Sequence, residues 1–148
     1  MSVLMELSRI FIREMTDMQI IELTEIGGDR TFPIVIGLAE AWAIERRLKG
    51  IEIRRPQTHD LLASTITHLN GRLKQIVIND LVDGTFYAKL IIIQNGEEIE
   101  VDSRPSDAIA LGVAEDVPIY VAEHVLAQTQ TDISDDPPDD EDLDLDWD

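Results

Sequence analysis

The chain has 148 residues, 44% of them hydrophobic, and its 30 acidic and 12 basic side chains give a net charge of −18. This length and apolar content suit one folded domain with a real core. Because no apolar run is long enough to span a bilayer and the start lacks a basic-then-apolar signal layout, we expect a soluble, cytoplasmic protein without membrane contact. The absence of cysteine excludes disulfides, thiolate metal ligands and thiol nucleophiles.

The N-terminal third of the chain predicts a meander followed by a helix. Residues 3–13, 18–26 and 31–36 are rich in Val, Ile, Leu and Phe, which favours three strands. From residue 37 onward, apolar side chains recur at spacings of three and four. This pattern predicts an amphipathic helix that ends at Gly50, a typical C-terminal cap.

The middle of the chain predicts a second helix and three further strands. A one-faced apolar repeat predicts a helix over residues 58–69, with Thr58 as its N-cap. Strands are expected at residues 73–79, 86–94 and 98–101. Asp-Gly and Asn-Gly dipeptides separate them, and these are strong hairpin signals, so the three strands should be antiparallel.

Residues 108–114 are apolar on every side of a helix. A short helix without a polar face must lie inside the domain. A short strand at residues 118–121 and one or two helical turns at residues 123–127 complete the pattern. Blocks of strands with helices between them predict an α+β domain with a mostly antiparallel sheet and two or three main helices, one of them buried.

The acidic residues are concentrated at the C-terminus. Residues 132–148 hold ten acids and no bases, which leaves twenty acids against twelve bases in residues 1–131, a net charge of −8. This composition predicts a disordered acidic tail after a folded domain of residues 1–131. One interpretation is a solvated solubility tail. The second interpretation is a segment that mimics nucleic acid or docks on a protein partner, because Leu143, Leu145 and Trp147 alternate with Asp.

Two polar segments share one layout, in which Arg-Pro precedes a predicted helix and an Asp lies in the first helical turn. The residues are Arg55, Pro56 and Asp60 in the first segment and Arg104, Pro105 and Asp107 in the second. One interpretation is structural, because first-turn acids interact favourably with the helix dipole by about 0.3–1 kcal/mol each. The arginines would then simply pair with these acids.

The other interpretation is chemical. The helix start after Arg104 would bind a phosphodiester through free amides and the guanidinium. Asp102 and Asp107 could hold a divalent ion such as Mg²⁺ or Mn²⁺, and His59 could act as a general base or as a further ligand. These are the parts of metal-assisted phosphodiester hydrolysis, although spacing alone leaves open whether they converge.

Two sequence blocks resemble the signatures of a known family. The segments RRPQTHDLL at 54–62 and VDSRPSDAIALG at 101–112, with PIYV at 118–121, are similar to those of the bifunctional nuclease family. The resemblance covers residues 3–126 and implies the α+β fold of that family, a homodimer, and nuclease activity on RNA or DNA. Seven residues lie at motif positions. We predict that four of them are catalytic: His59, Asp60, Asp102 and Asp107. Of these, Asp102 and Asp107 would also bind metal, and the other three, Arg55, Arg104 and Ser106, would bind phosphate.

The leading hypothesis is therefore a metal-dependent nuclease. The acidic charge disagrees with tight nucleic-acid binding, which usually depends on Lys and Arg contacts to phosphates. Two alternatives stay open. The domain could be a non-catalytic interaction or regulatory module of the same fold, or it could bind a small anion at a helix start without hydrolysis.

Overall fold

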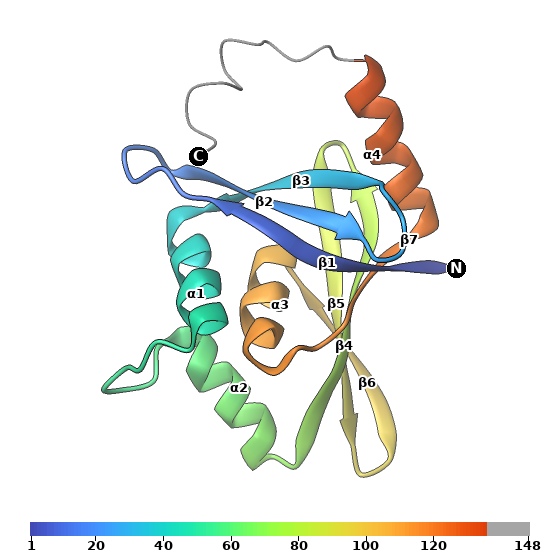
Figure 1. The fold of residues 1–148 in the computed structure, drawn as a ribbon. Coiled ribbons are helices and arrows are strands. Elements are labelled where there is room, and N and C mark those ends of the chain that lie inside the picture. The colour runs from blue at the N-terminus through green and yellow to red at the C-terminus, as the bar shows by residue number, and fades with distance from the viewer. Residues whose placement is uncertain (136–148) are drawn as a thin grey trace.

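In a computed structural model of the chain, which describes residues 1–135, the described residues form seven strands and four α-helices (Figure 1). The strands are β1 (Ser2–Phe11), β2 (Met18–Glu25), β3 (Thr31–Gly37), β4 (Gly71–Val82), β5 (Thr85–Gln94), β6 (Glu97–Ser103) and β7 (Ile119–Ala122). The helices are α1 (Leu38–Lys49), α2 (Thr58–His68), α3 (Pro105–Gly112) and α4 (Glu123–Asp135), with a short 3-10 turn, η1 (Val113–Glu115), after α3. The α+β class predicted from the sequence is confirmed.

The strands form one mixed sheet in the order β3-β2-β1-β7-β4-β5-β6. Every neighbouring pair is antiparallel except β7 and β4, which pair in parallel. The parallel pair arises because β7, the last strand of the described residues, inserts between the N-terminal meander and the β4–β5–β6 meander. The prediction of a mostly antiparallel sheet therefore holds for all but this central pair.

The sheet curls so that its edge strand β3 comes close to β5. Phe32 in β3 and Phe86 in β5 stack with ring centroids 5.5 Å apart, although four strands separate β3 from β5 in the sheet order. Strand twist accumulates across a large sheet and produces this curvature. We call the narrow space between β3 and the first residues of β5 the seam. The start of α3 lies beside it.

Helix α3 is the buried helix that the sequence predicts. Residues 108–112 are all buried, and the helix contacts α1, α2, β4 and β5 (Figure 1). Pro105 occupies the first turn, where its missing N–H costs no intrahelical hydrogen bond. The buried helix therefore fixes the position of the exposed Arg104 that precedes it.

The start of α2 differs from the sequence prediction in its cap. Gln57, and not Thr58, is the N-cap residue. Its backbone N–H donates a hydrogen bond of 3.0 Å to Oδ2 of Asp60, which occupies the third position of the helix. A first-turn acid that reaches back to the N-cap amide is half of a capping box, so Asp60 stabilises the helix start.

Helix α4 is longer than the one or two turns predicted, which makes the number of helices four. It packs on β3, β4 and β7 and buries Val125 and Leu126, and its backbone continues to Asp135, past the predicted start of the tail at residue 132. The rest of the predicted tail, with Leu143, Leu145 and Trp147, lies outside the described residues. Within residues 1–135, no helix has the length and apolar character needed to cross a membrane.

Candidate active site

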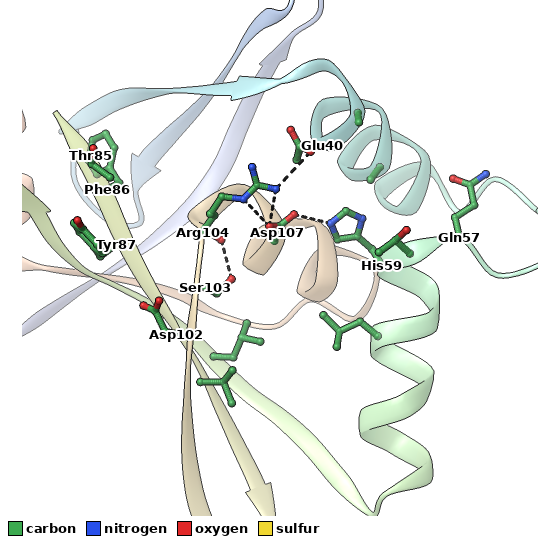
Figure 2. Close-up of a pocket in the computed structure, with 16 residues that line it drawn as sticks. Glu40, Gln57, His59, Thr85, Phe86, Tyr87, Asp102, Ser103, Arg104 and Asp107 are labelled. Atoms are coloured by element: carbon green, nitrogen blue, oxygen red, sulfur yellow. Dashed lines mark hydrogen bonds and ion pairs between the residues drawn. The ribbon is translucent and has the colours of Figure 1, made fainter.

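A hollow of about 810 Å³ lies between α1, the start of α2, and the ends of β5 and β6 that face them (Figure 2). The hollow brings together segments that are far apart in the sequence, because α1 and α2 both pack beside α3. The acidic, basic and histidine side chains that line it are Glu40, His59, Asp102, Arg104 and Asp107.

Three of these side chains form a connected chain of contacts with Glu40. Nε2 of His59 lies 2.9 Å from Oδ1 of Asp107. The other carboxylate oxygen of Asp107 accepts a hydrogen bond of 2.8 Å from Nε of Arg104. It also lies 2.8 Å from Nη2 of Arg104, in an ion pair. Nη2 of Arg104 also lies 3.5 Å from Oε2 of Glu40 in the first turn of α1. Figure 2 shows this chain of contacts running from α2 across the start of α3 to α1.

Asp107 is ionised in this arrangement. Burial raises the pKa of Asp107, but the hydrogen bonds from Arg104 and His59 outweigh burial and hold the pKa below its ordinary value. An ionised carboxylate can only accept hydrogen bonds, so it selects the His59 tautomer that carries its proton on Nε2. Nδ1 of His59 is then the nitrogen with a lone pair available for a proton. The same contact with Asp107 raises the pKa of Arg104.

Asp60 belongs to a different network, although it follows His59 directly in the chain. Its Oδ1 accepts a hydrogen bond of 2.6 Å from Nη1 of Arg47, and its Oδ2 accepts one of 2.8 Å from Nη2 of Arg46. Arg47 also donates to the carbonyl oxygens of Ala110 and Leu111, at 2.6 and 3.0 Å, near the end of α3. Asp60 therefore ties α2 to α1 and, through Arg47, to α3, and it does not line the hollow.

The other predicted site residues lie apart from His59. Asp102 lines the hollow, but its carboxylate points away from Asp107, toward the opposite side of β6 (Figure 2). Arg55 is exposed in the loop between α1 and α2 and does not line the hollow. Ser106 is buried and lines a second hollow at the seam.

Of the seven predicted site residues, the structure thus brings together His59, Arg104 and Asp107. Sequence reasoning missed Glu40, because a single acid in the first turn of a helix carries no signal beyond its favourable position at the helix dipole. Only the packing of α1 beside α3 shows that Glu40 reaches Arg104.

The predicted divalent-metal site is not formed by the arrangement of these side chains. Among the side chains that the structure describes, no three His, Asp or Glu side chains are grouped so that they could hold a metal ion. Both oxygens of Asp107 are engaged by His59 and Arg104, and Asp102 is turned away. Mg²⁺ takes oxygen ligands in near-octahedral geometry, which this donor set does not offer.

The fold and the hollow together define the class of this protein. The protein is an α+β domain with a curled mixed sheet and a concave site, in which a carboxylate orients a histidine beside a guanidinium. Such a site can transfer a proton and can contact an anion. The family model of the bifunctional nuclease domain matches residues 21–134, and the chain belongs to this family. The resemblance seen in the two sequence blocks is confirmed.

Individual relatives agree with this assignment. An uncharacterized protein of Mycobacterium tuberculosis is 45% identical over 119 residues, which are 80% of this chain and 71% of the relative. Bifunctional nuclease 1 and Bifunctional nuclease 2 of Oryza sativa subsp. japonica are 27% and 28% identical over 100 residues, or 66% of this chain. The matched regions make up only 30% and 31% of the two rice proteins.

Proposed function

We propose that this domain hydrolyses phosphodiester bonds in RNA or DNA, with His59, Asp107 and Arg104 as its working residues. The observation that carries the proposal is the contact of His59 with an ionised Asp107 that also binds Arg104, on the wall of a hollow large enough for a nucleotide. A histidine oriented by a carboxylate is a common general base, and an arginine is a common phosphate ligand. Membership of a nuclease-related family supports the same proposal.

Each residue has a separate task in the proposed reaction. Asp107 holds the imidazole, so that Nδ1 of His59 can accept a proton from water while the water oxygen attacks phosphorus. The bond from phosphorus to the leaving oxygen breaks, that oxygen takes a proton from solvent water, and His59 returns its own proton to solvent. Arg104 is 65% exposed, and its Nη1 has no hydrogen-bond partner among the described residues, so this group can donate to a phosphate oxygen.

The charge of the hollow limits how tightly it can hold nucleic acid. Glu40, Asp102 and Asp107 are three carboxylates against the single guanidinium of Arg104. Since affinity for nucleic acid comes largely from cations that neutralise phosphates, we propose weak substrate binding in this hollow. A phosphate bound to Nη1 of Arg104 leaves the 3.5 Å contact between Nη2 and Glu40 in place, so the carboxylate of Glu40 stays close to the substrate.

The proposal is tested by cleavage of single-stranded and duplex RNA and DNA oligonucleotides with the wild-type protein and with Arg104→Ala. We expect slow cleavage by the wild type and a loss of about 10²-fold in kcat/KM for the variant, the usual effect of removing one donor to a charged transition state. Arg54→Ala is the matched control, because Arg54 is exposed and lines neither the hollow nor the seam. Cleavage that is absent in the wild type, or equal in Arg104→Ala, contradicts the proposal.

Metal assistance stays a prediction, and Asp102 tests it. Because the Asp102 carboxylate points away from His59 and Asp107, we expect Asp102→Asn to keep kcat/KM within about threefold of the wild type, a change of less than about 0.7 kcal/mol. The measurement is cleavage with Mg²⁺, with Mn²⁺ and with EDTA. Loss of activity both in EDTA and in Asp102→Asn would instead show that the acidic side chains regroup around an ion.

The non-catalytic alternatives have one observation in their favour. Both oxygens of Asp107 and both of Asp60 are already satisfied within the protein, as in a purely structural network. An interaction module would then lose stability and no activity when these residues are replaced, and an anion-binding module would bind phosphate without cleaving a diester. The homodimer, the cytoplasmic location and the protein partner of the tail stay predictions.

A further inference from the structure

A second hollow, of about 500 Å³, occupies the seam of the curled sheet. Its walls are residues 33–37 of β3, residues 84–86 at the start of β5, and the start of α3. It shares Thr85, Phe86 and Arg104 with the first hollow. The two hollows therefore meet at Arg104, the residue proposed to contact the phosphate that is cleaved.

Ser106 presents an unpartnered hydroxyl group to the second hollow. The residue is only 6% exposed and lines this hollow, yet its hydroxyl has no hydrogen-bond partner among the described residues. Buried hydroxyl groups in proteins are usually hydrogen-bonded, and leaving one without a partner costs free energy. The hydroxyl group of Ser106 is therefore free to donate to an acceptor that enters this hollow.

The start of α3 adds further donors at the same place. No side chain caps this helix, and Pro105 at its first position has no N–H. The backbone N–H groups of Ser106 and Asp107 have no intrahelical acceptor, because they lie in the first turn. Free amides and the positive end of the helix dipole favour an anion here.

The charges around the two hollows differ in a way that favours phosphate in the second. Asp17 and Arg104 are the acidic and basic residues that line the second hollow, so their charges balance. The first hollow has three carboxylates against the same guanidinium. A phosphate that is bound but not cleaved therefore meets less electrostatic repulsion in the second hollow than beside His59.

We propose that the second hollow is a binding subsite for a second phosphate of the same nucleic-acid strand, next to the phosphodiester that is cleaved beside His59. Ser106 donates its hydroxyl hydrogen to an oxygen of this phosphate, the first-turn amides of α3 donate alongside it, and Arg104 lies between the two phosphates. The subsite binds and undergoes no covalent step. Cleavage of the neighbouring phosphodiester rests on the proposed function, but the binding of a phosphate in the second hollow does not depend on it.

The test compares the thymidine dinucleotide TpT with the same dinucleotide carrying a 5′-phosphate or a 3′-phosphate, by calorimetric titration and by cleavage. In the wild type, we expect one terminal phosphate to tighten Kd about tenfold, the size of a hydrogen bond to a charged group. Ser106→Ala should remove this advantage and leave the Kd for unphosphorylated TpT unchanged. Ser64→Ala, on an exposed part of α2 that lines neither hollow, should keep the advantage.

A second variant changes the affinity in the opposite direction. Asp17→Asn removes the acid from the rim of the seam hollow, so we expect the phosphorylated dinucleotide to bind about twofold tighter and TpT to bind as before. The inference is wrong if neither terminal phosphate improves binding to the wild type, or if Ser106→Ala keeps the improvement. If binding behaves as expected but no diester is cleaved, the proposed hydrolysis fails while the phosphate subsite stands.

Discussion

Asp60→Asn is expected to lower the free energy of unfolding by about 3 kcal/mol, the cost of removing one partner from a largely buried ion pair. The variant leaves the guanidinium groups of Arg46 and Arg47, only 14% and 9% exposed, beside each other without a counter-charge. It also weakens the link from Arg47 to the end of α3. For a domain of this size the loss corresponds to a decrease in Tm of about 10 °C, measured by thermal unfolding followed by circular dichroism.

Asp80→Asn is the matched control for this prediction. Asp80 contacts His124 at 3.4 Å, but their side chains are 48% and 62% exposed. Replacing such an exposed carboxylate should change the free energy of unfolding by less than about 0.5 kcal/mol. Equal effects of the two substitutions would contradict the structural role of Asp60.

The same network predicts how stability depends on pH. Burial raises the pKa of Asp60, but hydrogen bonds from Arg46, the Gln57 amide and Arg47 outweigh it and lower the pKa below its ordinary value. A lowered pKa adds stability that is present above the unfolded-state pKa of about 3.9 and is lost as the pH falls through the folded-state pKa. The stability difference between the wild type and Asp60→Asn should therefore be largest near neutral pH and should shrink below about pH 4.

His59→Asn is expected to lower kcat for oligonucleotide cleavage by about 10² to 10⁴-fold, the usual contribution of a general base. Asp107→Asn should act through His59, because an amide can donate to Nε2 and so stabilise the wrong tautomer of the imidazole. The measurement is the pH dependence of kcat/KM in the wild type and in both variants. We expect kcat/KM of both variants to stay far below the wild-type value throughout the pH range, because neither variant keeps Nδ1 of His59 as an oriented proton acceptor.

His68→Asn is the control for this second prediction. His68 lies on α2 with a hydrogen bond to the backbone of Ser64, and it does not line the hollow. Its replacement should leave both kcat and the pH profile unchanged. A kcat in His59→Asn equal to that of the wild type would show that another group is the general base. Equal losses in His59→Asn and His68→Asn would indicate a general structural effect.

The secondary structure could be predicted because its signals are local. Alternating apolar residues, the Asp-Gly and Asn-Gly turns, and the all-apolar segment of α3 each depend on neighbouring residues, and each element appears where it was expected. The length of α4 could not be predicted in the same way. Its sequence has few apolar residues, and the contacts that support it come from β3, β4 and β7.

In the candidate site, too, the contiguous motifs could be found in the sequence, but the contacts between distant residues could not. The predicted site residues came from the two Arg-Pro blocks, because these blocks resemble those of the family. The sequence could not separate His59 from Asp60, which are adjacent in one helical turn. Successive residues on a helix point in directions about 100° apart, so one can face the hollow while the other faces α1.

The sequence alone determined the order of the elements, the buried position of α3 and the family, since these depend on periodicity and on contiguous motifs. Tertiary structure decided which acid meets which base. His59 meets Asp107 and Asp60 meets Arg47 only because α1, α2 and α3 pack together, and Ser106 reaches the seam only because the sheet curls. An ion pair between distant residues leaves no local pattern in the chain, because its geometry exists only after the helices have packed.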